Sequence, residues 1–233
     1  MFLVCVEWLC VRIEAMAPGI QRVLTLACAA AFLGFFLLRL THEVHRRSHQ
    51  GHYPVEYEAM GIESWDPFSH HTTVESLMKI PSRLLAPRQY GHWDVMDVYL
   101  GLDYAGLRLC LAIELLDYLF IFTFTMLLVD LLTISLLPIT GGSGAVQYLD
   151  ALPAIAALAD MAENFCFIGT LLRWPDTSPF PLTEYASVFT TIKCKVLVLV
   201  GGTIILCAIV SVASLVTGGR AAKTKSKPAQ KVE

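Results

Sequence analysis

Two apolar stretches of this chain carry acidic and amide side chains of the kind that can hold a proton, pair with a base or join two helices. Glu114 and Asp117 lie three residues apart in one stretch, so a helix would place them on one face. Asp160, Glu163 and Asn164 repeat this spacing in the next stretch. An uncompensated charge in the middle of a membrane-spanning helix costs ~2.5 to 3.5 kcal/mol, so we expect these groups to face the interior of a helical bundle.

A base that could compensate these acids lies in the last apolar stretch. At a helical rise of ~1.5 Å per residue, Asp117, Glu163 and Lys193 all lie about 10 to 15 Å in from the same side of the membrane if the last helix begins near residue 186. We therefore expect Lys193 to pair with Glu163 or Asp117, with Asn164 completing the hydrogen bonds. Such a cluster could be a pathway for protons or a substrate, or a clasp that fixes helix register, and the clasp is favoured. Asp130 has no evident basic partner, so a neutral or water-contacting acid is expected there.

A group of histidines after the first apolar stretch is a second candidate site. His42, His45, His49 and His52 would fall within ~80° of one another on a continuous helix, and imidazoles on one face could bind zinc. A glycine and a proline among and after these residues indicate that the helix ends there, which favours a solvated segment beside the membrane. No cofactor is expected apart from this zinc alternative.

The composition of the chain is that of a membrane protein. Of its 233 residues, 55% are hydrophobic and 16% charged, with a mean hydropathy of +0.59, whereas about 25% of residues are charged in soluble domains. The net charge of -3 leaves no basic face for nucleic acid. The expected partners are the lipid bilayer and either other membrane proteins or further copies of this chain.

The elements that must position these residues are long apolar helices. We predict an all-α fold, a four-helix transmembrane bundle with one long extramembrane loop between the first and second spans. Short helices are expected within that loop, near 74–85 and 93–100. The predicted parts are an N-terminal, interfacial segment 1–20, spans at 21–40, 108–137, 151–173 and 188–217, an extramembrane loop 41–107, and a basic disordered tail 218–233.

The ends of the chain allow more than one interpretation. The first span could instead be a cleaved signal peptide, although no clean small-residue cleavage site follows it. Met16 is an alternative start of the chain. An even number of spans puts both termini on one side, and the distribution of Lys and Arg favours the cytoplasmic side.

Three short motifs resemble those of a known family. The chain is similar to a family of small, uncharacterised four-span integral membrane proteins with a D-x-x-E-N third span and F-T-x-x-K at the start of the fourth. The resemblance covers about residues 20–217 and implies the four-span layout, without an established activity. The matching residues are Asp160, Glu163 and Asn164, then Phe189, Thr190 and Lys193, and in the second span Leu116, Asp117 and Tyr118.

Three functions fit the sequence. The first is a non-catalytic subunit, assembly factor or scaffold with an internal polar clasp, whose small residues in the first and fourth spans allow close helix packing. The second is a small proton-coupled transporter that uses the acidic cluster and Lys193. The third is a metal-dependent membrane enzyme that uses the histidines, although no known catalytic motif is present.

Overall fold

The chain is described by a computed structural model in which the elements are helices, with no strand in the described residues. Four of its helices, α2, α6, α8 and α9, are long and apolar enough to cross a membrane. The described residues are 18–48, 84–140, 148–149, 151–176, 178 and 181–225. The helices are α2 (Pro18–Arg47), α5 (His92–Leu100), α6 (Tyr104–Thr140), α8 (Ala151–Arg173) and α9 (Leu182–Lys225). The predicted four-helix transmembrane bundle is confirmed, and the chain is a multi-pass membrane protein.

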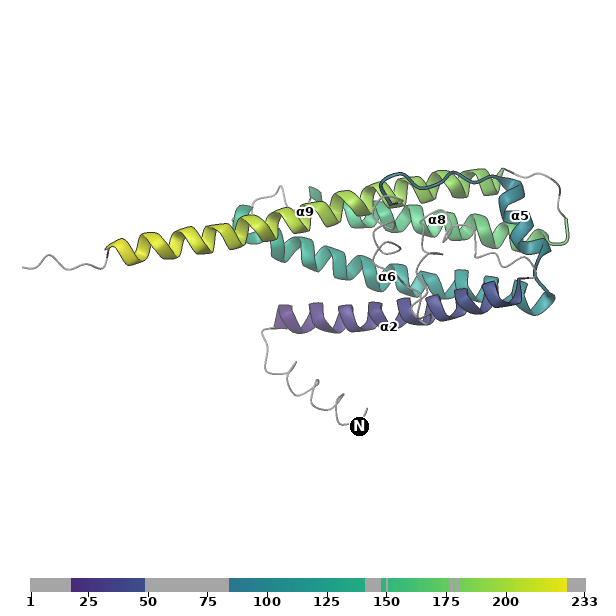
Figure 1. The fold of residues 1–233 in the computed structure, drawn as a ribbon, viewed down its shortest axis with the longest axis horizontal. Helices are drawn as coiled ribbons and strands as arrows, with labels where there is room; N and C mark the ends of the chain where they lie inside the picture. The colour runs from purple at the N-terminus through teal and green to yellow at the C-terminus, as the bar shows by residue number, and fades with distance from the viewer. Residues whose placement is uncertain are drawn as a thin grey trace, which may run out of the picture.

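The four long helices run up and down beside one another, with α6 at the centre of the arrangement (Figure 1). The α8 and α9 helices form the most extensive pair, and α6 packs against both of them. The α2 helix packs chiefly on α6. The start of α2 and the end of α9 lie at one end of the molecule, and α5 lies at the other (Figure 1). Which end faces the cytoplasm stays a prediction.

Three helices extend beyond the bounds that the sequence predicted for the spans. The α2 helix continues to Arg47 because Glu43 pairs with Arg46 and Arg47 one turn on, at 2.7 and 2.9 Å, so these charges support the helix. The α6 helix already begins at Tyr104, since the Asp103 carboxylate accepts the Gly106 N–H at 2.7 Å and caps the first turn.

The fourth span also differs from its predicted bounds. The α9 helix begins at Leu182, where the carbonyl oxygen of Pro181 accepts the N–H of Tyr185 at 3.0 Å, and it runs to Lys225. Residues 218–225, predicted as the start of a disordered tail, are therefore helical. Residues 1–17 and 226–233 lie outside the described residues, as does 74–83 of the first short helix predicted in the loop.

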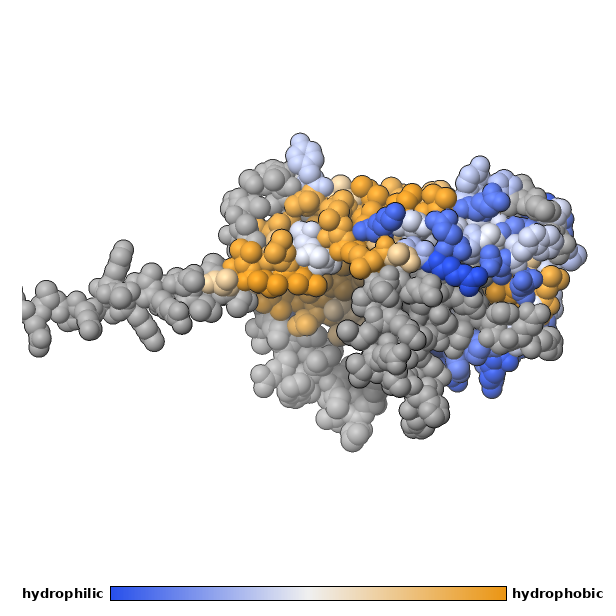
Figure 2. Space-filling view, turned by 45° about the horizontal axis from the view of Figure 1, so that its top comes forward, coloured by the Kyte–Doolittle hydropathy of each residue, from blue (hydrophilic) through white to orange (hydrophobic). Residues whose placement is uncertain are grey.

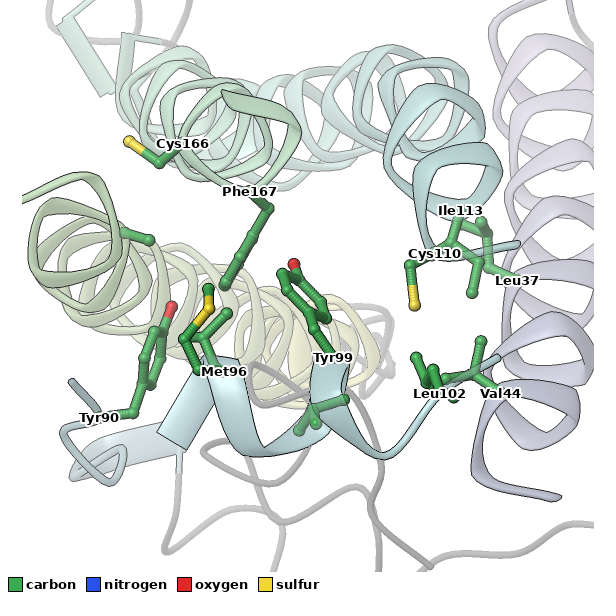
Figure 3. Packing of buried hydrophobic residues seen from close by; sticks show 13 residues of the cluster. Leu37, Val44, Tyr90, Met96, Tyr99, Leu102, Cys110, Ile113, Cys166 and Phe167 are labelled. Atoms are coloured by element: carbon green, nitrogen blue, oxygen red, sulfur yellow. The ribbon is translucent and has the colours of Figure 1, made fainter. Parts of the chain in front are cut away.

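The second short helix of the loop is α5, which closes one end of the bundle. Its first turn is capped by Asp94, whose carboxylate accepts the Gly91 N–H at 2.8 Å. The apolar side chains of α5 and its flanks point toward the long helices (Figure 3). They form one core with residues of α2, α6 and α8, among them Val95, Met96, Tyr99, Leu102, Val44, Ile113 and Phe167.

The outer surface of the bundle is largely apolar. Figure 2 shows hydrophobic residues covering the middle of one face, while hydrophilic residues gather at the end that carries α5. On α8 the exposed apolar residues recur at helical spacing, which is the pattern of a helix with one face toward lipid. They are Ile155, Leu158, Met161, Phe165 and Leu172.

The contact between α2 and α6 combines close packing with an ion pair. The Phe120 ring lies so near Gly34 that a methyl group there would meet its Cε2 atom at 3.3 Å, whereas Gly201 of α9 has nothing within 4 Å. Arg22 Nε lies 2.8 Å from Asp130 Oδ2. The prediction that Asp130 has no basic partner was therefore wrong, because the partner comes from a helix more than a hundred residues away in sequence.

Candidate functional site: a buried polar cluster between α8 and α9

The α8 and α9 helices are joined by a buried lysine that contacts two carboxyl groups. Lys193 Nζ lies 2.7 Å from Asp160 Oδ1 and also pairs with Glu163 Oε2. The side chain of Glu163 is 0% exposed and that of Lys193 is 9% exposed. Both acids reach the same ammonium because they are three residues apart on the face of α8 that meets α9.

Two hydroxyl groups complete the surroundings of Glu163. Thr190 lies one turn before Lys193 on α9, and its hydroxyl donates to Glu163 Oε1. The Tyr90 hydroxyl lies 2.7 Å from Thr190 Oγ1 and 3.2 Å from Glu163 Oε1. Both Glu163 oxygens thus have partners from outside α8, which offsets the cost of burying the carboxyl group.

Tyr90 reaches the cluster from the loop that precedes α5. This segment runs along the first turns of α9 (Figure 1), where the Tyr90 N–H donates to Ser187 Oγ at 3.2 Å and the Gln89 amide donates to Thr191 Oγ1 at 3.4 Å. The Tyr90 ring stacks on Phe167 of α8 with ring centroids 6.1 Å apart. Figure 3 shows both side chains at this edge of the core.

A side-chain amide on α8 joins the α6 helix to the cluster. Asn164 Nδ2 donates to Asp117 Oδ2 at 2.8 Å, and the neighbouring Tyr118 hydroxyl donates to the Met161 carbonyl oxygen at 3.2 Å. Asp117 is thereby linked to the turn of α8 that carries Glu163. Glu114, one turn before Asp117, is buried.

The inner face of α9 carries a line of buried polar side chains that leads to the cluster. The spacing of four and three residues keeps them on the one face that packs against α8. Beyond Lys193, the buried residues among the described side chains of this helix are apolar or cysteine, such as Val200. The line consists of Thr183, Ser187, Thr190 and Lys193.

A small cavity adjoins the ion pair on its far side from the loop. Its volume is about 20 Å³, which is room for about one water molecule, and Asp160 and Lys193 form part of its wall. Apart from these two and Thr125, the lining residues are apolar, and Phe124 and Leu197 are among them. A single water could bond to the ion pair here, whereas a metabolite-sized molecule would not fit.

The sequence-predicted candidates fall into two groups. All six residues of the predicted polar cluster lie in α6, α8 and α9, and the structure joins Lys193 to Glu163 and Asn164 to Asp117. Asp160 as a direct partner of Lys193 was not anticipated, nor were the roles of Thr190 and Tyr90. The three-residue spacing of Thr190 and Lys193 could have indicated that both face α8. Nothing near Tyr90 in the sequence indicates a contact with α8.

The histidine site is only partly described. His42 and His45 lie on α2 with ring centroids 6.1 Å apart, while His49 and His52 lie outside the described residues. Within the part of the chain that the structure describes, no group of three or more His, Cys, Asp or Glu side chains could hold a metal ion.

One acidic group outside the spans has a strongly shifted pKa. Asp176, in the turn between α8 and α9, accepts hydrogen bonds from the Ser178 hydroxyl at 2.6 Å and the Ser178 N–H at 2.9 Å, and its other oxygen lies 2.6 Å from the Arg173 guanidinium. These donors favour the carboxylate form, so they hold the pKa of Asp176 well below its usual range.

Comparisons of the chain with protein-family models, with curated proteins and with solved structures find no match. The resemblance to a family of four-span membrane proteins therefore stays a prediction.

Proposed function

We propose that this chain is a non-catalytic membrane subunit, assembly factor or scaffold, in which the cluster around Lys193 is a clasp that fixes the packing of α8 against α9. The observation that supports this most directly is that the cluster's groups are turned toward one another. Lys193 contacts two carboxyl groups, and Glu163 has partners at both oxygens. Polar contacts of this kind are among the few forces that join helices in lipid.

The size of the cavity favours the clasp over a substrate carrier. A carrier needs a binding site that accommodates its substrate, whereas the cavity beside Asp160 and Lys193 has room for about one water molecule. Apart from Thr125, its wall beyond the ion pair is apolar, which is a poor environment for an ion crossing the bundle. The proton-coupled transporter that the sequence also allowed therefore has less support.

The proposal is tested by comparing two glutamate substitutions in the full chain. Glu163→Gln removes the charge that pairs with Lys193, while Glu184→Gln makes the same change at an exposed position near the start of α9. Each protein is purified from membranes in mild detergent, and its abundance and the mass of its assembly are measured by native mass spectrometry. We expect wild type and Glu184→Gln to purify in assemblies larger than the 25.8 kDa chain, and Glu163→Gln to yield less protein and smaller assemblies.

A flux measurement separates the clasp from a carrier. Vesicles that contain the wild-type chain should pass protons no faster than empty vesicles. Proton flux that exceeds this background and disappears in Glu163→Gln, with the protein still folded, would replace the clasp by a transport function. A wild-type chain that is monomeric, and as abundant as Glu163→Gln, would also contradict the proposal.

A further inference from the structure

Lys195 is a charged side chain on the outer face of α9, away from the bundle. It is exposed, and among the described residues it has no ion pair or hydrogen bond. Its exposed neighbours on the same face are apolar, with Ile192 about one turn before it and Leu199 about one turn after it. This face is suited to lipid everywhere except at the lysine.

The shortest span fixes the depth of Lys195 in the membrane. The α8 helix has 23 residues, so at ~1.5 Å per residue it is only slightly longer than the ~30 Å hydrocarbon core. The α8 and α9 helices run in opposite directions (Figure 1), and Lys193 contacts Asp160, which sets these two residues at one level. Lys195 therefore lies about 10 Å from the level of Ala151, where α8 begins, and about 22 Å from the level of Arg173, where it ends. This depth is inside the hydrocarbon core.

The side chain of Lys195 is poorly placed to extend its ammonium group to water. Side chains of a helix lean toward its N-terminus, and α9 begins at the end of the bundle that carries α5. The side chain therefore leans toward the farther surface, about 22 Å away, which is beyond the reach of a four-carbon stem. Charged groups that stay inside a membrane are paired, so Lys195 requires an anionic partner.

The exposed residues around Lys195 have the spacing of a contact between two helices. They recur at alternating steps of three and four residues, as in the seam of two packed helices. Gly202 belongs to this series, and a methyl group added there would have no neighbour within 4 Å, so a second helix could approach the α9 backbone closely. The series consists of Ile192, Lys195, Leu199, Gly202, Leu206 and Ile209.

The described part of the chain does not supply the anionic partner through a second copy. Two copies that packed through this face in one orientation would place Lys195 against Lys195. The acids of the described spans are turned inward or paired within the chain, as Asp130 is with Arg22. A polar loop does not enter the lipid-exposed hydrocarbon region, because its backbone groups would lose their hydrogen bonds. A membrane-spanning helix of another protein satisfies all these conditions.

We propose that the outer face of α9 binds a membrane-spanning helix of another protein, and that an aspartate or glutamate of that helix pairs with Lys195. The inference rests on the proposed function as a subunit or assembly factor and specifies the class of partner. Lys193 and Lys195 are two residues apart, so they point to opposite sides of α9. The inner face holds α8 through Lys193, and the outer face holds the partner through Lys195.

Synthetic membrane-spanning peptides test the charge requirement. Each is a leucine-rich helix of about 20 residues that carries glutamate about 10 Å from one end, glutamate at the very end, or no acid. The full chain with a donor dye and each peptide with an acceptor dye are reconstituted in phosphatidylcholine vesicles, and energy transfer reports binding. We expect the peptide with the inner glutamate to bind about tenfold more tightly than the other two, as one polar contact between helices in lipid implies. Lys195→Met should abolish this preference and Lys195→Arg should keep it.

Two neighbouring glycines test which face binds the peptide. Gly202→Val places a side chain on the proposed seam, whereas Gly201→Val makes the same change at a position outside the series. We expect Gly202→Val to weaken binding of the inner-glutamate peptide and Gly201→Val to leave it unchanged. Both glycines have open space around them, so neither change should disturb the fold of the chain itself.

Three results would overturn the proposal. The first is equal binding of the three peptides, and the second is equal binding of the inner-glutamate peptide by wild type and Lys195→Met. The third is loss of the glutamate preference when phosphatidylglycerol is added, which would assign Lys195 to an anionic lipid headgroup. Native mass spectrometry separates these failures from failure of the proposed function. If Lys195→Met keeps wild-type assemblies while Glu163→Gln loses them, the docking face is wrong and the clasp stands.

Discussion

Replacing Lys193 by methionine should destabilise the folded chain strongly, because it leaves two carboxyl groups without their base. Glu163 is fully buried and Asp160 largely so, which makes this a buried ion pair with one partner removed. Such changes cost about 3 to 5 kcal/mol. Protonation of the stranded acids limits the loss, so we expect a decrease of about 3 kcal/mol in the free energy of unfolding. The measurement is unfolding by a denaturing detergent in mixed micelles, followed by circular dichroism.

The chain contains a matched control for this change two residues away. Lys195 is exposed on another face of α9, so Lys195→Met removes the same charge without breaking an ion pair. We expect it to change the free energy of unfolding by less than about 0.5 kcal/mol. Combining Lys193→Met with Glu163→Gln should recover part of the loss, because one stranded acid is then neutral. The reasoning is refuted if Lys193→Met unfolds at the same detergent concentration as Lys195→Met.

Three further changes test other parts of the structure. Asp130→Asn should lower the free energy of unfolding by no more than about 1 kcal/mol in the same measurement, because its partner Arg22 is 54% exposed. A larger loss would mean that this ion pair is more shielded from solvent than the exposure of Arg22 implies. Gly34→Val should loosen α2 from α6 and speed hydrogen exchange in α2, whereas Gly201→Val, in open space, should not, and equal exchange in the two variants would contradict the packing. The hydrogen bonds of Asp176 should be retained at neutral pH and lost only well below about pH 4, because its pKa is lower in the folded turn than in the unfolded chain. The carboxylate therefore stabilises the turn above the unfolded pKa, and this contribution disappears as pH falls through the folded pKa. Amide shifts in a nuclear magnetic resonance titration report the change, and loss of the bonds near neutral pH would be inconsistent with the turn.

The fold was predictable from the sequence because membrane-spanning helices have a strong local signal. Apolar runs of about 20 residues identified the four long helices, and helical spacing placed Asp160 and Glu163 on one face. The ends of the helices were less predictable, since the first span was predicted to stop at residue 40, before Glu43 and Arg46, which pair within the continuing helix. The first charged residues after an apolar run do not mark the end of its helix. Ion pairs between residues three or four apart can continue the helix beyond that point.

The partners in the cluster were less predictable than its members. Tyr90 contacts groups that are 73 and 100 residues away in sequence, so no local pattern could indicate it. Arg22 and Asp130 show the same limit, because their contact depends on α2 packing against α6. Spacing predicts which side chains share a face of a helix, while the choice of the facing helix depends on tertiary packing that the sequence pattern does not contain.

Three neighbouring pairs of long helices in this bundle, α2 with α6, α6 with α8 and α8 with α9, are each joined by a polar link. In lipid the hydrophobic effect does not drive one apolar helix against another, so side-chain packing and polar contacts decide which helices pair and in what register. The links differ in burial, from a half-exposed ion pair at one end of α2 to a fully buried one in the middle of α8, and their contributions should differ in the same order. This order requires that loss of the α8–α9 link lowers the stability of the whole bundle strongly, while loss of the α2–α6 link only loosens α2. The links are Arg22 with Asp130, Asn164 with Asp117, and Lys193 with Asp160 and Glu163.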